Sequence, residues 1–60
     1  MLGRVSIPIS AGRPGEVILK IRGGSEAFTA YTQGDEPLAA NARVVVIEQL
    51  SPRTLLVTGC

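Results

Sequence analysis

The sequence predicts an all-β protein built from five short strands, and three observations support that prediction. β-branched residues and apolar–polar alternation recur along the chain, whereas apolar residues at helical spacing are rare. Turn-forming glycine and proline residues separate the alternating runs at intervals of roughly ten residues. The chain has 60 residues, which is enough for one domain with a small core.

The first predicted strand spans residues 3–9. Alternation over this run places Val5, Ile7 and Ile9 on one face of the strand. Pro8 lies on the other face, and because proline cannot donate a backbone hydrogen bond it indicates a sheet edge or the end of the strand. The turn-rich stretch SAGRPG follows.

Residues 16–22 and 25–32 form the clearest predicted hairpin. The first of these runs alternates, with its inward side chains expected to be Val17, Leu19 and Ile21. Gly23 and Gly24 are expected to supply the positive φ angles of a two-residue turn. In the returning strand, Phe28 and Ala30 are the expected inward residues.

The segment QGDEPLAAN, residues 33–41, interrupts the strands. Pro37 is typical of the first turn of a short helical or 3₁₀ segment, and Asn41 suits a left-handed exit from it. Leu38 is expected to plug one end of the structure. The sequence therefore predicts a short helical turn before the fourth strand.

The fourth strand is expected at residues 43–50 and the fifth at 54–58, joined by a tight turn at 51–53. The uninterrupted run VVVI in the fourth strand indicates either a strand covered on both faces or a bulge that redirects one residue. Leu55 and Val57 are the expected inward residues of the last strand.

Five strands in one small domain favour a closed barrel, because closure removes exposed sheet edges. An SH3-like barrel has the same number of strands and is the structural alternative. Three strands ahead of the interrupting segment favour the order of an OB fold. The predicted fold is therefore a small five-stranded OB-fold barrel with a short helical turn before strand four.

The residue types argue against catalysis. The chain contains no histidine and a single lysine, Lys20, which alternation places on an outer face. The only thiol, Cys60, is the last residue, where chain ends usually fray. We therefore expect no catalytic residue, no metal site, no cofactor and no small-molecule substrate.

Single-stranded nucleic acid is the alternative partner. Such sites combine a basic groove with aromatic stacking platforms, but the net charge is only +1 at pH 7, and Phe28 and Tyr31 alternate to opposite faces. A basic stripe is possible only if the fold gathers Arg4, Lys20, Arg22, Arg43 and Arg53. The sequence disfavours this alternative.

The phase of two strands predicts an outward apolar patch. If Val17 and Leu19 fill the barrel, Ile18 faces outward, and if Val44 points inward, Val45 and Ile47 point outward. The candidate partner-binding residues are therefore Ile18, Val45 and Ile47. The other interpretation is that these are scattered exposures or are covered by another element.

A pattern of glycine and aliphatic residues runs through nearly the whole chain. It consists of Gly3-Arg4-Val5, the stretch RPGEV at 13–17, Gly23, Ala30, the stretch EPLAANARVVVI at 36–47, Leu55 and Val57. In this pattern the chain resembles the C-terminal soluble OB-fold domain of NfeD-like membrane proteins. Asn41 stands where the family has glycine, and Gln49 stands where it tends to have an aliphatic residue.

The resemblance implies that residues 1–60 form one domain of a longer, membrane-anchored protein, attached through segments absent from this chain. It implies a non-catalytic protein-interaction domain that works with stomatin- or flotillin-like scaffold proteins or with a membrane protease. It also implies a membrane-associated protein with this soluble domain on the cytoplasmic side.

Overall fold

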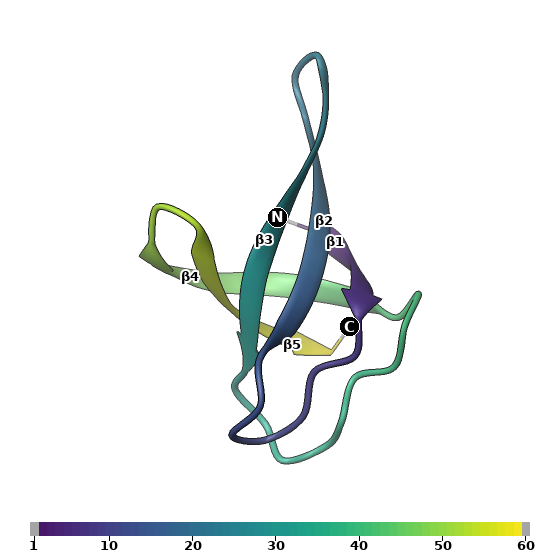
Figure 1. Ribbon diagram of the computed structural model, residues 1–60, viewed down its shortest axis with the longest axis vertical. Coiled ribbons are helices and arrows are strands. Elements are labelled where there is room, and N and C mark those ends of the chain that lie inside the picture. The colour runs from purple at the N-terminus through teal and green to yellow at the C-terminus, as the bar shows by residue number, and fades with distance from the viewer. Residues whose placement is uncertain (1, 60) are drawn as a thin grey trace.

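A computed structural model describes residues 2–59, and in that part of the chain it contains five strands and no helix (Figure 1). The strands are β1 (Leu2–Ile7), β2 (Gly15–Ile21), β3 (Gly24–Thr32), β4 (Arg43–Ser51) and β5 (Thr54–Gly59). The all-β prediction is confirmed. The expectation of a frayed end at Cys60 lies outside the described residues.

The strands close into a barrel in the order β1-β2-β3-β5-β4, with β4 pairing back to β1. All neighbouring pairs are antiparallel except β3 and β5, which run parallel. Figure 1 shows the β2–β3 hairpin projecting at one end, while the β1–β2 and β3–β4 loops lie together at the other. The predicted closed barrel is confirmed. A hairpin projects from one of its ends, and two loops cover the other.

Alternating side chains from all five strands, together with one loop residue, fill the barrel. The buried core consists of Val5, Ile9, Val17, Leu19, Ala30, Val44, Leu55 and Val57. Phe28, Leu38, Ala42 and Val46 are half-buried and pack against it. The apolar side chains of a strand with one inward face recur every second residue, so most of this set follows from the sequence pattern.

The first strand is shorter than predicted, and the prediction that Ile7 lies in the core is wrong. Ile7 is 53% exposed, whereas Val5 and Ile9 are buried. The pairing of β1 with β2 shifts by one residue between Val5 and Ile7, so that Ile7 lies opposite Glu16. Because a one-residue shift moves a side chain to the other face, Ile7 faces solvent.

The β2–β3 hairpin is confirmed, but its turn lies one residue earlier than predicted. Ile21 pairs with Gly24, so the two turn residues are Arg22 and Gly23, and Gly23 supplies a positive φ of 87°. Ile21 was expected inside the barrel and is instead an exposed residue. The hairpin extends beyond the barrel at this point (Figure 1).

The predicted helical turn before β4 does not form. Backbone donors of this segment bond to other parts of the barrel: the Leu38 N–H to the Ile9 carbonyl and the Asn41 N–H to the Val5 carbonyl. A helix would direct those donors within the segment. Two other expectations hold, since Asn41 has a φ of 74° and the half-buried Leu38 packs against the core.

The run VVVI in β4 contains a register shift, as one of the two predicted alternatives required. Val46 lies opposite Val57 and Glu48 opposite Leu56, which leaves Ile47 as an extra residue. A second shift between Gln49 and Ser51 leaves Leu50 extra in the same way. Such bulges bend a strand and redirect its side chains.

Candidate functional site

The hairpin end of the barrel opens into an apolar groove of about 330 Å³. The groove is lined by Leu19, Ile21, Phe28, Val46, Gln49 and Leu55. Leu19 and Leu55 belong to the buried core, so the floor of the groove is the core itself. A concave, mostly apolar site of this kind can receive the apolar side chains of a partner.

Three large exposed aliphatic residues lie on strands that contribute to this groove. Ile21 of β2 lines it, and Ile47 and Leu50 of β4 are not lining residues but directly follow Val46 and Gln49, which are. Their exposed fractions are 43%, 43% and 48%. We call the groove and these three residues the barrel mouth. Both β4 members are the extra residues at the two register shifts of this strand.

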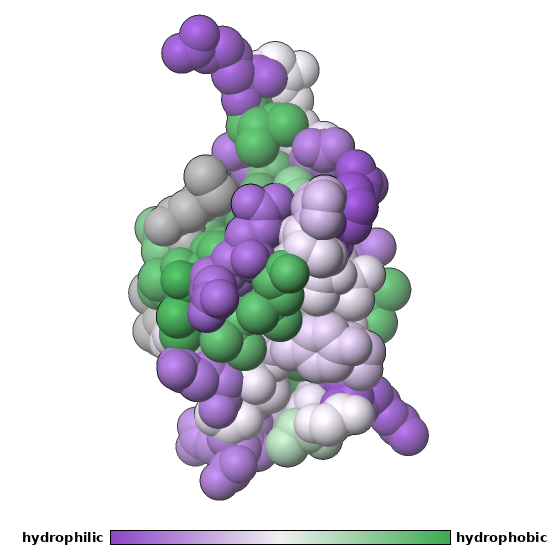
Figure 2. Space-filling view, turned by 90° about the vertical axis from the view of Figure 1, so that its left-hand side faces the viewer, coloured by the Kyte–Doolittle hydropathy of each residue, from purple (hydrophilic) through white to green (hydrophobic). Residues whose placement is uncertain are grey.

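Figure 2 views the molecule from the side on which the β4–β5 hairpin lies in Figure 1. Hydrophobic surface gathers on this side, and hydrophilic side chains cross it. An apolar surface bordered by polar groups is typical of a protein-interaction site.

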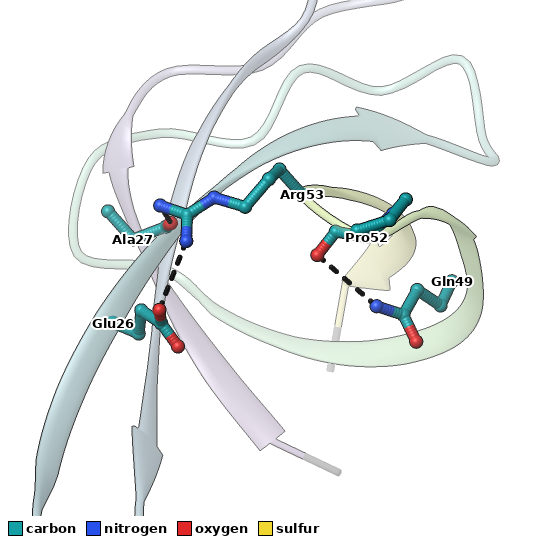
Figure 3. Close-up of polar contacts among 5 residues, drawn as sticks. All are labelled: Glu26, Ala27, Gln49, Pro52 and Arg53. Atoms are coloured by element: carbon teal, nitrogen blue, oxygen red, sulfur yellow. Dashed lines mark hydrogen bonds and ion pairs between the residues drawn. The ribbon is translucent and has the colours of Figure 1, made fainter.

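Arg53 fastens the β4–β5 turn to β3 beside the mouth (Figure 3). Its Nη1 donates to Glu26 Oε1 at 3.0 Å and its Nη2 to the Ala27 carbonyl at 3.4 Å. The guanidinium also lies 5.7 Å from the centroid of the Phe28 ring, within the range of a cation–π interaction. Gln49 Nε2, near the end of β4, donates to the Pro52 carbonyl of the same turn at 3.3 Å.

The structure places the three candidate residues predicted from strand phase on β2 and β4. Ile18 and Val45 are half-buried on the outer surface, and β1 runs between them, with Arg4 opposite Ile18 and Leu2 opposite Val45. Ile47 is exposed further along β4. Their role in partner binding stays a prediction.

A second depression lies on the outer face of β4, β1 and β2, with a volume of about 260 Å³. Its lining residues are Leu2, Gly3, Arg4, Ile18, Lys20, Ser25 and Arg43. We call this site the basic hollow. Sequence reasoning named its cations as members of a possible stripe, but only the strand register shows that they share one site with Ile18.

The fold therefore gathers three of the five cations that the nucleic-acid alternative required. Arg53 is engaged with Glu26, and Arg22 lies in the β2–β3 turn. The aromatic residues lie on opposite faces as predicted: Phe28 packs against the core, and Tyr31 is exposed. Neither aromatic residue lines the basic hollow.

Two further features concern the described part of the chain, residues 2–59. It contains no group of three or more His, Cys, Asp or Glu side chains able to hold a metal ion. No helix there reaches the length and hydrophobicity that crossing a membrane requires. The expectation that the domain is not an enzyme stays a prediction.

Comparison with known proteins places this barrel in a family. The chain is similar to the solution structure of the soluble domain of the NfeD protein YuaF from Bacillus subtilis, with a TM-score of 0.82 and 24% identity. That similarity covers 97% of this chain and 68% of the other. None of the curated proteins compared with the chain matches it. The family model of the NfeD C-terminal domain matches residues 2–58. The chain therefore belongs to the NfeD C-terminal domain family, whose proteins are membrane-associated and carry this part as a soluble domain.

Proposed function

We propose that this chain is a non-catalytic protein-interaction domain of an NfeD-like membrane protein and that the barrel mouth is its docking surface. The observation that carries the proposal is an apolar groove whose floor is the core and which is lined by the exposed Ile21, with the exposed Ile47 and Leu50 next in the chain to its lining residues Val46 and Gln49. Covering the exposed part of each such side chain would contribute about 1 kcal/mol to binding.

The contacts that Arg53 makes beside the mouth support the same proposal. The Arg53 contacts with Glu26 and Ala27 hold the β4–β5 turn against β3. A surface that is already ordered before binding loses less conformational entropy when a partner docks. The mouth is therefore organised for contact in the unbound domain.

The family resemblance supports the choice of partner. We propose a stomatin- or flotillin-type membrane scaffold protein, or a membrane protease, as the protein that docks on the mouth. Attachment to the membrane would come from segments absent from this chain, with the domain on the cytoplasmic side. A partner held at the same membrane would meet the domain at high effective concentration, so a small docking surface can suffice.

We also propose that the barrel is an OB fold. Five strands close with β1 pairing both β2 and β4, and β3 pairs in parallel with β5. This is the arrangement expected of a five-stranded Greek-key barrel. The order supports the OB class over the SH3-like alternative.

The docking proposal is tested by binding of the purified domain to a purified stomatin-type protein. Ile47→Lys and Leu50→Lys place a charge at the mouth, and each is expected to weaken binding by about tenfold or more. Ile7→Lys is the matched control, because Ile7 is an exposed side chain of the same size as Ile47 and Leu50. It pairs with Glu16 at the start of β2, whereas the mouth lies at the end of β2.

Circular dichroism first establishes that all three variants are folded. The proposal fails if the two mouth variants bind like the wild type, or if the Ile7 variant loses as much affinity as they do. The first result means that the mouth is not used, and the second means that any added charge is enough to weaken binding.

Single-stranded nucleic acid remains the second candidate, because the basic hollow gathers Arg4, Lys20 and Arg43. Against it, the residues that line the hollow include no aromatic platform for base stacking. Titration with a labelled oligothymidylate at low salt tests this candidate. Micromolar binding that weakens steeply with added salt would favour it over protein docking.

A further inference from the structure

Two arginines lie directly opposite each other on the outer face of the barrel. In the antiparallel pairing of β1 with β4, Arg4 is the partner of Arg43. Like charges at opposed positions of neighbouring strands destabilise a sheet. Lys20 of β2 lines the same hollow, so three positive side chains surround one small depression.

No acidic side chain in the described part of the chain offsets this charge through an ion pair. Among residues 2–59, the ion pair that forms joins Arg53 to Glu26, on the β3 and β5 side of the barrel. Glu16, the acidic residue two positions before Ile18 in β2, accepts a hydrogen bond of 2.6 Å from the Ser6 hydroxyl instead. The hollow therefore keeps its positive charge available to a ligand.

The hollow also has an apolar component. Leu2 is 61% exposed at its edge, and the half-buried Ile18 lies among the cations. Neighbouring strands are about 4.8 Å apart, so the side chains of Arg4 and Arg43 can reach one carboxylate together. A matching ligand offers carboxylates beside an aliphatic group.

We propose that the basic hollow binds an acidic peptide segment in which carboxylates flank an aliphatic side chain. Charge complementarity selects the acidic groups, and Leu2 with Ile18 accommodates the aliphatic one. The absence of an aromatic residue from the lining disfavours nucleic acid. A flat membrane surface is contacted by protruding side chains of a protein. A hollow instead receives a side chain that projects from its ligand, and this favours a peptide over a membrane.

This site goes beyond the docking surface proposed above. The lining residues of the hollow and of the groove at the mouth have no member in common. The variants that test one site leave the other unchanged, so failure of one proposal is distinguishable from failure of the other.

The test uses a fluorescein-labelled peptide of sequence Glu-Leu-Glu-Leu-Glu, titrated with the 60-residue chain by fluorescence anisotropy at low salt. Arg4→Gln and Arg43→Gln are each expected to weaken binding by about tenfold, because each removes a charge-assisted hydrogen bond. Arg13→Gln is the matched control, since Arg13 is an exposed cation of the β1–β2 loop outside the hollow. It is expected to bind like the wild type.

Two altered peptides separate the contributions of charge and apolar contact. Gln-Leu-Gln-Leu-Gln lacks the carboxylates and is expected not to bind, and Glu-Gly-Glu-Gly-Glu lacks the aliphatic groups and is expected to bind more weakly. In the wild-type protein, amide chemical shifts are expected to change first at Gly3, Ile18 and Ser25. This last measurement does not depend on the folding of any variant.

Several results would overturn the proposal. Equal weakening by Arg13→Gln would mean general charge attraction, and shift changes confined to the mouth would place the peptide elsewhere. Tighter binding of oligothymidylate, or of vesicles containing phosphatidylserine, than of the acidic peptide would assign the hollow to nucleic acid or to a lipid surface.

Discussion

Ile9 and Leu38 exchange two backbone hydrogen bonds, 3.0 and 2.7 Å long, between the β1–β2 loop and the β3–β4 loop. Both residues lie outside the named strands. The side chain of Ile9 is completely buried, and that of Leu38 packs against the core. The pair closes the end of the barrel opposite the mouth, where the named strands have ended and loops cover the core.

The first prediction compares two isoleucines that lie two positions apart. Ile9→Ala is expected to reduce the free energy of unfolding by about 2–5 kcal/mol, because it leaves a cavity in the core. Ile7→Ala, at an exposed position, is expected to cost less than about 1 kcal/mol. Urea unfolding of both variants measures the difference. Equal losses would mean that both side chains face inward, as uninterrupted alternation would require.

The same two isoleucines show which core residues can be predicted from the sequence and which cannot. Alternation identifies the inward residues of a regular strand, so Val5, Val17 and Val57 were predictable from pattern alone. It fails at Ile7 because the insertion of one residue into the pairing reverses the face, and no local residue type signals that shift. The Ile9–Leu38 bridge is non-local, which is why residues 33–41 resembled a helical turn in isolation.

The two surface sites were predictable to different extents. The outward phase of Ile18 and the exposure of Ile47 follow from strand periodicity and the run VVVI. The mouth also needs Leu50, which is extra at a second register shift that the sequence does not reveal. The hollow depends on the opposition of Arg4 and Arg43, a pairing between β1 and β4 that are far apart in the chain.

The second prediction concerns Gly15, at the start of β2. A Cβ atom at this position would overlap the carbonyl oxygens of Ile7 and Pro8, which are backbone atoms with little freedom to move. Gly15→Ala is therefore expected to cost about 3 kcal/mol, a large part of the stability of a small domain. Thermal and urea unfolding would measure this loss.

Gly34 provides the control for that substitution. A Cβ atom there would meet nothing within 4 Å. Gly34→Ala is expected to change the free energy of unfolding by less than about 1 kcal/mol, in the stabilising direction if at all, because alanine restricts the unfolded chain. Similar losses at the two positions would contradict the close approach at Gly15.

The third prediction concerns Asn41, which has a φ of 74° and donates its N–H to the Val5 carbonyl at 2.8 Å. Asn41→Gly is expected to be nearly neutral, because glycine adopts this conformation without strain. Asn41→Val is expected to cost about 1–2 kcal/mol, since a β-branched residue is strained there. Chemical unfolding of the pair isolates the backbone effect. A neutral valine variant would show that the turn adopts another conformation.

The last prediction concerns Arg53 and separates stability from binding. The side chains of Arg53 and Glu26 are 67% and 41% exposed, so their ion pair is screened by solvent and salt. Arg53→Met keeps an apolar stem but removes the charge, and it is expected to cost less than about 1 kcal/mol of stability. That loss is expected to shrink in 1 M salt, at which the Debye length is about 3 Å.

If the ion pair orders the β4–β5 turn for docking, the same variant weakens partner binding more than this small stability change can explain. Arg13→Met is the matched control, because Arg13 is an exposed cation in the β1–β2 loop at the other end of the barrel and forms no ion pair among the described residues. The comparison is made by urea unfolding at two salt concentrations and by titration with the stomatin-type protein. Equal effects of the two variants on binding would mean that the Arg53 contacts do not organise the mouth.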